Sequence, residues 1–520
     1  MTVTADPPAA RRTTAAPRKA LVLVTVCLAA LTINLDTTIV NVALPSLAVE
    51  LDASTRELLW IVDGYNLAFA ALVLAMGSLS DRFGRRPSLV LGLAVFTLAS
   101  GIAALVDSSG ALIALRFVMG AAAALIFPTT LSVIANTFRD RRERAAALGA
   151  WGAAVGLGVA LGPVAGGALL EHFSWHSVFW ALVPVGLVTI GMTLAFVPES
   201  RDPSVPALDR PGLLVSVGAL GLLTWTIIEA PEHGWASAAT LLGFAGAAVL
   251  VAVFVVLERR VAHPMLDVTL FADRRFSAAC GAVTVAFFSL FGFIFLITQY
   301  FQLARDYSPL GTGARILPVA ICIAIASVAG GALAPRVGTK AVVTTGLVLL
   351  GSSFLWISAV VEIDTSYPAV IVPQMVLMGL GLGLISTPAT ESILQVLPPA
   401  RAGVGSAVND ATRELGGTLG VAVIGSLFSS LYADELGRLL GGAGGPGLDD
   451  ATLAAAEESV GYAHELSGQL PAVLPALQEA FLRGLEAGTL TIGSLCLVGA
   501  LAALVALPGR RFVPPGGSGE

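Results

Sequence analysis

The chain has 520 residues, of which 56% are hydrophobic and only 12% are charged, and its formal net charge is −6. Soluble domains carry about 25% charged residues, so a water-facing surface could not hide this much apolar material, and a soluble enzyme is excluded. A disordered scaffold needs low hydrophobicity, and a nucleic-acid-binding protein needs a basic face. Neither description fits, and the class that remains is a membrane protein with many spans.

Few residues of this chain suit metal, redox or nucleotide chemistry. The four cysteines all lie within long apolar runs, where they are typical of small packing residues. The five histidines show no metal-ligand spacing, and the phosphate-binding pattern G-x-x-x-x-G-K-[ST] does not occur. We therefore expect no metal, no cofactor and no use of ATP.

Apolar segments long enough to cross a bilayer recur along the whole chain. A spanning helix needs roughly 20 predominantly apolar residues, and charged or Pro/Gly-rich breaks separate fourteen such runs. Their predicted limits are 20–44, 57–77, 88–107, 110–136, 145–169, 176–197, 211–230, 236–257, 277–303, 311–334, 341–361, 368–394, 405–432 and 484–507. The predicted fold class is an all-α integral membrane protein with fourteen transmembrane helices.

Basic residues are distributed unevenly between alternate loops. An even number of spans places both termini on one side, and that side carries twenty-two arginines and lysines. The opposite side carries five, which are Arg56, Arg305, Arg315, Arg438 and Arg483. Because basic loops stay in the cytoplasm, we predict a multi-pass protein of the cell membrane with both termini cytoplasmic.

Two loops suggest an internal duplication. The segment Gly77-Ser-Leu-Ser-Asp81-Arg82-Phe-Gly84 follows the second span, and the weaker Gly331-Ala-Leu-Ala-Pro-Arg336-Val-Gly338 follows the tenth. If these loops are equivalent, spans 1–6 match spans 9–14, and spans 7 and 8 are an inserted hairpin. The predicted organisation is a cytoplasmic tail (1–19), a first six-helix half (20–197), a linker with two extra helices (198–275), a second six-helix half (276–507) and a tail (508–520). An external acidic loop, 433–483, is expected to be solvated.

Five motifs, in order along the chain, resemble those of a known family. They are Leu35-Asp36-Thr-Thr-Ile-Val-Asn41-Val-Ala-Leu-Pro45, Trp60-Ile-Val-Asp63-Gly-Tyr65, the loop from Gly77 to Arg86, Arg116-Phe-Val-Met-Gly120, and the glycine-proline run from Gly158 to Gly167. Each is weak alone, and together they are specific. Over residues 20–507 the chain resembles the fourteen-span drug:proton antiporters of the major facilitator superfamily, the EmrB/QacA type. The resemblance implies the major facilitator fold, with two six-helix halves and alternating access.

Ionisable side chains within the spans are candidates for proton coupling, since such residues are costly in a membrane. Asp36 and Asp63 could each bind a proton on one side and release it when the surroundings change; capping of a helix break is the alternative. Arg116 keeps its proton, so its predicted role is to pair with an acid, and a purely structural ion pair is the alternative. On an ideal helix Asn34, Thr38 and Asn41 share one stripe, whereas Asp36 lies on the face of Thr32.

The loop after the second span predicts a conformational latch. Gly77 and Gly84 permit close backbone approach and a tight turn, and Asp81 could accept from Arg85 or lie against a helix N-terminus. Such a contact would have to break as the halves move. The candidate latch residues are Gly77, Asp81, Arg82, Gly84, Arg85 and Arg86.

The fifth span, 145–169, combines small residues with one proline. Small residues allow a neighbouring helix to pack closely, and Pro163 removes one backbone hydrogen bond and can kink the helix. The family resemblance implies an antiporter-type motif, made of Gly158, Gly162, Pro163, Gly166 and Gly167. Tight packing alone is the alternative interpretation.

Two further groups are candidates for the transport path. Aromatic and amide residues of the ninth span recur at steps of three and four and predict a stripe facing a cavity, although phenylalanines facing lipid are the alternative. The substrate-cavity candidates are Tyr65, Phe288, Phe291, Phe295, Gln299 and Gln302. A cytoplasmic gate, or simply a solvated helix start, is predicted for Asn409, Asp410, Arg413 and Glu414.

These features favour a transporter over the other classes of membrane protein. We predict efflux of drugs or other amphipathic organic compounds in exchange for protons, with the proton gradient as the energy source and small molecules, protons and lipids as the partners. Proton-coupled symport of a small metabolite and dedicated export of one natural product remain open. A membrane enzyme would need a nucleophile with a base or a metal cluster, which the sequence lacks, and a receptor would not need intramembrane aspartates.

Overall fold

The computed structural model describes residues 15–201, 209–262, 264–396, 402–441 and 448–507, and the regular structure within these ranges is helical. Fourteen of the described helices are long and apolar enough to span a membrane, which confirms the predicted number. They are α1 (Ala15–Glu50), α2 (Thr55–Phe83), α3 (Arg85–Ala103), α4 (Ser109–Thr137), α5 (Arg141–Leu170), α6 (His176–Phe196), α7 (Arg210–His233), α8 (Ala238–Arg260), α9 (Arg274–Gln299), α10 (Pro309–Val337), α11 (Thr339–Val360), α12 (Val372–Gln395), α13 (Ala402–Leu440) and α16 (Val473–Ala506).

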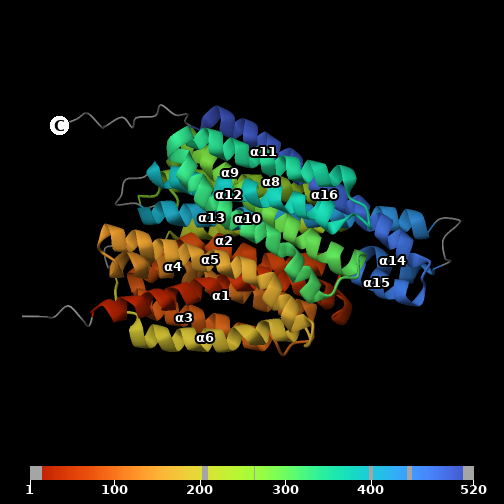
Figure 1. The fold of residues 1–520 in the computed structure, drawn as a ribbon, viewed down its shortest axis with the longest axis horizontal. Coiled ribbons are helices and arrows are strands. Elements are labelled where there is room, and N and C mark those ends of the chain that lie inside the picture. Colours follow the sequence, from red (N-terminus) through yellow and green to blue (C-terminus); the bar gives the residue numbers. More distant parts are fainter. Residues whose placement is uncertain (1–14, 202–208, 263, 397–401, 442–447, 508–520) are drawn as a thin grey trace, which may run out of the picture.

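The spanning helices form two halves with the same internal packing. In the first half α1 packs along α5, α2 along α4, and α3 along α6. In the second half the equivalent pairs are α9 with α13, α10 with α12, and α11 with α16. Figure 1 shows the first half at the bottom of the view and the second half at the top, with all the long helices running in roughly the same direction. The predicted duplication of spans 1–6 as spans 9–14 is therefore confirmed.

The two repeated loops share an unusual backbone conformation. Gly84 separates α2 from α3 with φ at +119°, and Gly338 separates α10 from α11 with φ at +96°. Side chains with a Cβ atom rarely adopt this region, whereas glycine enters it without strain. The structure thus explains why both loops keep a glycine although their charged residues differ.

Helices α7 and α8 form the inserted hairpin. They pack against each other, and α7 also contacts α2 and α13, one helix from each half. Arg56, at the start of α2, pairs with Glu229 at 3.1 Å and with Glu232, both near the end of α7. The insertion is therefore attached to both halves rather than lying apart from them.

The described part of the acidic segment between α13 and α16, residues 448–472, is folded, so the expectation of a solvated loop was wrong for these residues. Two short helices, α14 (Asp450–Glu458) and α15 (Val460–Gln469), lie at one end of the bundle (Figure 1). The hydroxyl of Ser459 donates to the carbonyl of Ala53 at 3.1 Å, and Tyr432 donates to the carbonyl of Ala456 at 3.1 Å. Composition suggested solvation, but alanines and valines on one side of these helices are buried against both halves.

One acidic side chain of the α14–α15 segment lies where burial disfavours its charged form. Glu457, on α14, is half-buried. Burial, and to a lesser extent the charge of Asp434, raises the pKa of the Glu457 carboxyl. The folded α14–α15 segment therefore binds a proton at Glu457 more tightly than the unfolded chain does.

The two halves are in close contact at the end where α14 and α15 lie. A Cβ atom on Gly167 of α5 would come within 2.4 Å of the Pro309 carbonyl oxygen of α10, and one on Gly313 within 2.1 Å of the Pro163 carbonyl oxygen. Gln302, in the short turn η2 (Tyr300–Ala304) after α9, donates to the Val42 carbonyl of α1 at 3.0 Å. Glycines are required where α5 and α10 meet because no side chain fits between their backbones.

Candidate functional site

A buried ion pair links α1 to α4 in the interior of the first half. The Arg116 guanidinium donates from Nη1 to Oδ2 of Asp36 at 2.7 Å, and both side chains are fully buried. Nε of Arg116 donates to the Ile61 carbonyl of α2 at 2.9 Å. Oδ1 of Asp36 makes no hydrogen bond in the described part of the chain. The structure thus brings together two of the three residues predicted for proton coupling.

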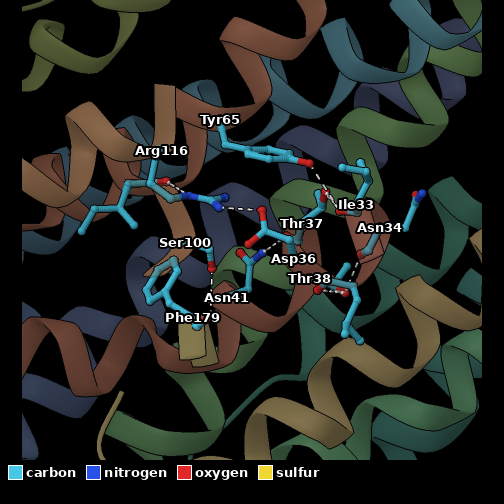
Figure 2. A network of polar contacts seen from close by, with 12 residues as sticks. Ile33, Asn34, Asp36, Thr37, Thr38, Asn41, Tyr65, Ser100, Arg116 and Phe179 are labelled. Carbon is cyan, nitrogen blue, oxygen red and sulfur yellow. Dashed lines mark hydrogen bonds and ion pairs between the residues drawn. The ribbon is translucent and has the colours of Figure 1, made fainter. Parts of the chain in front are cut away.

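Tyr65 covers this pair from α2, as Figure 2 shows. The guanidinium carbon of Arg116 lies 4.4 Å from the centroid of the Tyr65 ring, a cation–π contact. The Tyr65 hydroxyl donates to the Ile33 carbonyl at 3.4 Å. Sequence analysis grouped Tyr65 with the substrate-cavity residues, and the structure places it in the polar network instead.

Gly120 sets the approach of α4 to α2 beside this network. A Cβ atom at Gly120 would lie 2.2 Å from the backbone carbonyl oxygen of Tyr65, so no other residue fits without moving a helix. Arg116 precedes Gly120 by one turn and lies under the Tyr65 ring for this reason. The spacing Arg-x-x-x-Gly is therefore a packing requirement as well as a motif.

Asn34 and Thr38 of α1 turn away from Asp36. Asn34 donates to the Ala30 carbonyl at 2.8 Å and Thr38 to the Asn34 carbonyl at 3.2 Å, each within α1 (Figure 2). This stripe faces α5, where Gly158 and Gly162 pack against it. Asn34 and Thr38 thus lie on a different face of α1 from Asp36, as predicted. Asn41, the third member of the predicted stripe, donates to the Thr37 carbonyl at 2.9 Å.

Asp63 lies apart from the Asp36–Arg116 pair, on α2. Its side chain is fully buried, and neither of its carboxylate oxygens makes a hydrogen bond to a described residue. Asn66, three residues further on, is near enough to interact with it electrostatically. Asp63 is therefore a second buried acid with less compensation than Asp36.

The predicted latch residues form a connected group between α2, α3 and the end of α6. Asp81 accepts from Nε of Arg85 at 2.7 Å, and Arg86 donates to the Leu194 carbonyl at 2.5 Å. The backbone N–H of Arg85 donates to the Ser200 carbonyl at 2.9 Å. Of the two partners predicted for Asp81, the structure selects Arg85. Arg82, in contrast, is exposed.

The small residues of α5 face two different helices. Gly158, Gly162 and Gly166 face α1: a Cβ atom at Gly162 would lie 1.9 Å from the Thr38 hydroxyl oxygen. Gly167 and the Pro163 carbonyl face α10 of the other half. The motif therefore joins α1, which carries Asp36, to the contact between the halves.

The α9 stripe is packed against a helix. Phe288, Phe291 and Phe295 are buried, and the glycines at 417 and 420 of α13 lie against the first two. Gln299 donates to the Phe295 carbonyl at 3.2 Å, whereas Gln302 crosses to α1. The alternative of lipid-facing phenylalanines is wrong, since these rings point into the second half.

The α13 group is divided between two environments. Asn409 and Asp410 are buried, and Thr390 of α12 donates to Asn409 at 2.9 Å. Arg413 and Glu414 are half-buried, and the Arg413 guanidinium lies 4.4 Å from the centroid of the Phe287 ring. Glu414 is close enough to Tyr65 to act on it electrostatically. The alternative of a solvated helix start is therefore wrong for Asn409 and Asp410.

Two pseudo-repeated six-helix bundles that span the membrane define a transporter of small molecules. Among the described residues, no group of three His, Cys, Asp or Glu side chains could hold a metal ion. The model of the Major Facilitator Superfamily matches residues 26–421. The chain belongs to this superfamily.

Similar proteins cover nearly the whole chain. The multidrug efflux pump LfrA of Mycolicibacterium smegmatis is 37% identical over 96% of this chain and 98% of its own length. The methyl viologen resistance protein SmvA of Salmonella typhimurium is 33% identical, with coverages of 92% and 97%, and the tetracenomycin C resistance and export protein of Streptomyces glaucescens is 31% identical, with coverages of 95% and 92%. In fold, the chain is similar to a bacterial homologue of the human lysosomal transporter Spinster in an inward-facing conformation, with a TM-score of 0.65, 17% identity and coverages of 95% and 99%.

Proposed function

We propose that this protein exports drugs or other amphipathic organic compounds across the cytoplasmic membrane in exchange for protons. The names of its relatives, which are efflux pumps and resistance proteins, support efflux. The observation that carries proton exchange is the Asp36–Arg116 pair, a carboxylate and a guanidinium that are fully buried between α1 and α4. The driving force is the proton gradient, without a cofactor.

One carboxylate oxygen of Asp36 is available to take a proton. Oδ2 faces Arg116, while Oδ1 is without a hydrogen-bond partner among the described residues and is the oxygen that would receive the proton. A proton on Asp36 removes the negative charge that holds Arg116, whereas Arg116 keeps its own charge. The ion pair is therefore weakened by protonation, and α1 and α4 lose one contact that fixes their relative position.

Transport into inverted membrane vesicles under an imposed pH gradient tests this proposal. Asp36→Asn should abolish accumulation of an organic cation such as ethidium but leave downhill exchange, because substrate exchange without a gradient needs no proton release. Asp107→Asn is the matched control, since Asp107 is an acid with a side chain that is 84% exposed. Normal accumulation by Asp36→Asn would exclude Asp36 as the required proton carrier, and the same assay on Asp63→Asn then examines the second acid. Accumulation of one compound class alone would favour a dedicated exporter.

We also propose the cytoplasmic membrane as the location, with both termini and the tails 1–19 and 508–520 in the cytoplasm. The described chain begins and ends at the same end of the bundle, opposite α14 and α15 (Figure 1). A reporter inserted at Gly445 should be external, and one after Arg511 cytoplasmic; both positions lie outside the described residues. A reporter at Arg511 on the external side would contradict the proposed topology. The boundaries 20–197, 198–275 and 276–507 for the two halves and their linker belong to the same proposal.

A further inference from the structure

A pocket of about 200 Å³ lies between the inserted hairpin and the two halves. Its walls come from α7, α8 and the segment between α8 and α9, and from α2 and α13, which belong to opposite halves. Asp36, Arg116 and Tyr65 do not line it. We call it the lateral pocket, and it is separate from the buried polar network.

The lining of the lateral pocket suits hydrocarbon. Two side chains with hydroxyl groups face it, Ser216 and Thr412, and the rest of the lining is aliphatic, aromatic or methionine. Each hydroxyl donates within its own helix, Ser216 to the Leu213 carbonyl at 3.0 Å and Thr412 to the Val408 carbonyl at 2.6 Å. A polar solute that moved from water into this pocket would lose its hydrogen bonds to water and find no free donors in the lining, which is unfavourable.

The lateral pocket opens toward the outer face of the bundle. Val251 and Phe271 line it and are nevertheless 48% and 42% exposed. Only 17% of the α8 span is buried, so α8 turns most of its residues outward. Since lipid covers this face in a membrane, acyl chains can reach the pocket directly.

Exposed arginines gather at the same end of the insertion. Arg210 begins α7, Arg259 and Arg260 end α8, and Arg274 begins α9. All four are exposed and form no ion pair with the residues that the structure describes. Arginines beside a membrane surface attract anionic lipid headgroups and bind phosphate through several donors.

Two of the four acids at this junction are buried. Asp209 and Glu258 are buried. Asp209 accepts from the backbone N–H of Gly212 at 2.9 Å, and Glu258 accepts from that of Leu266 at 3.1 Å. Asp267 and Asp273 lie in the same segment, and each accepts from a backbone N–H at the start of a helix. The four exposed arginines outnumber these two acids, so positive charge predominates near the pocket.

We propose that the lateral pocket binds an anionic phospholipid from the leaflet on the arginine-rich side, with one acyl chain in the pocket and the phosphate among the arginines. The pocket supplies an apolar chain site that opens to lipid, and the arginines supply the complementary charge. Because α2 and α13 belong to opposite halves, the bound chain contacts both of them, and its binding is linked to their relative position. The inserted hairpin thereby gains a role as the outer wall of a lipid site.

Native mass spectrometry of the purified full chain, equilibrated with equal amounts of phosphatidylglycerol and phosphatidylcholine, tests the proposal. The wild type should retain phosphatidylglycerol in preference to phosphatidylcholine. Ala219→Phe, which places a ring in the pocket, should lose the retained lipid, whereas Val249→Phe should keep it, because Val249 lies on the lipid-facing side of the same hairpin and is 61% exposed. Arg259→Gln and Arg260→Gln should each lower the preference for phosphatidylglycerol by about fivefold while phosphatidylcholine still binds.

Three results would overturn the proposal. Retention of lipid by Ala219→Phe at the wild-type level would mean that the lipid binds elsewhere. Both arginine variants alter exposed side chains, which leaves the fold intact. An unchanged preference for phosphatidylglycerol in these variants would exclude headgroup recognition. Displacement of the retained phosphatidylglycerol by ethidium in the wild type would make the pocket a substrate site instead.

Discussion

The Asp36–Arg116 pair allows its structural role to be separated from its role in coupling. Removal of one partner of a buried ion pair costs about 3–5 kcal/mol, because the other charge stays buried without compensation. Asp36→Asn leaves the Arg116 guanidinium with the Ile61 carbonyl and the Tyr65 ring. Arg116→Gln leaves the buried Asp36 carboxyl without its partner at 2.7 Å. We expect each single variant to lose stability in this range.

The double variant Asp36→Asn/Arg116→Gln should recover most of that stability, because no buried charge remains to be compensated. Thermal denaturation of the four purified proteins gives a double-mutant cycle, and the interaction energy should exceed about 2 kcal/mol, as for groups in direct contact. Vesicle transport is measured on the same four proteins. The double variant should be folded and still unable to concentrate substrate on a pH gradient.

Two outcomes would refute this reasoning. Additive losses of stability in the cycle would mean that the two side chains do not act as a pair. A stable double variant that concentrates substrate would mean that Asp36 carries no obligatory proton, and Asp63, Asp410 or Glu414 would be examined next.

Three further predictions concern α5, the loop between α2 and α3, and α14. Gly162→Ala should abolish transport or folding, because its new methyl group has no space. Gly156→Ala on the same helix should be normal, because no atom lies within 4 Å of its Cβ position. Equal behaviour of the two variants would contradict the packing argument. Asp81→Asn should slow turnover more than it weakens substrate binding, measured as transport rate against binding affinity, and unchanged turnover would exclude a latch. Packing of α14 against the bundle should be strongest below the usual glutamate pKa of 4.5 and weaken as the pH rises through the raised pKa of Glu457. Hydrogen exchange of α14 should show this dependence, and Glu457→Gln should remove it.

The number of helices and their division into halves could be predicted because they depend on local properties of the sequence. Apolar length and the distribution of basic loops follow directly from residue composition along the chain. The limits of the helices could not be predicted as well: α1 continues to Glu50 and α16 begins at Val473, beyond the predicted limits 20–44 and 484–507. The polar ends of α1 and α16 remain helical where they pack against α15. Hydropathy cannot predict this contact.

The residues of the site could be predicted from the sequence, but the contacts between them could not. A charged residue in an apolar run identifies Asp36, Asp63 and Arg116 as candidates from the sequence alone. Which acid pairs with Arg116 depends on the positions of α1, α2 and α4, and these are set by contacts between residues far apart in the chain. Gly120 was a partial signal, since a glycine one turn from an intramembrane arginine indicates that another helix approaches closely. Its contact with Tyr65, however, could be identified only from the fold.

The arrangement of α1 offers a physical link between the proposed proton site and the movement of the halves. One face of α1 carries Asp36 toward Arg116, and another face, with Thr38, packs without a gap against the glycines of α5. The same α5 meets α10 of the other half through backbone contacts at Gly167. Because helices this closely packed shift as rigid bodies rather than deform, a change in the Asp36–Arg116 contact that moves α1 must also move α5. In the proposed mechanism, protonation therefore acts on the contact between the halves through α1 and α5.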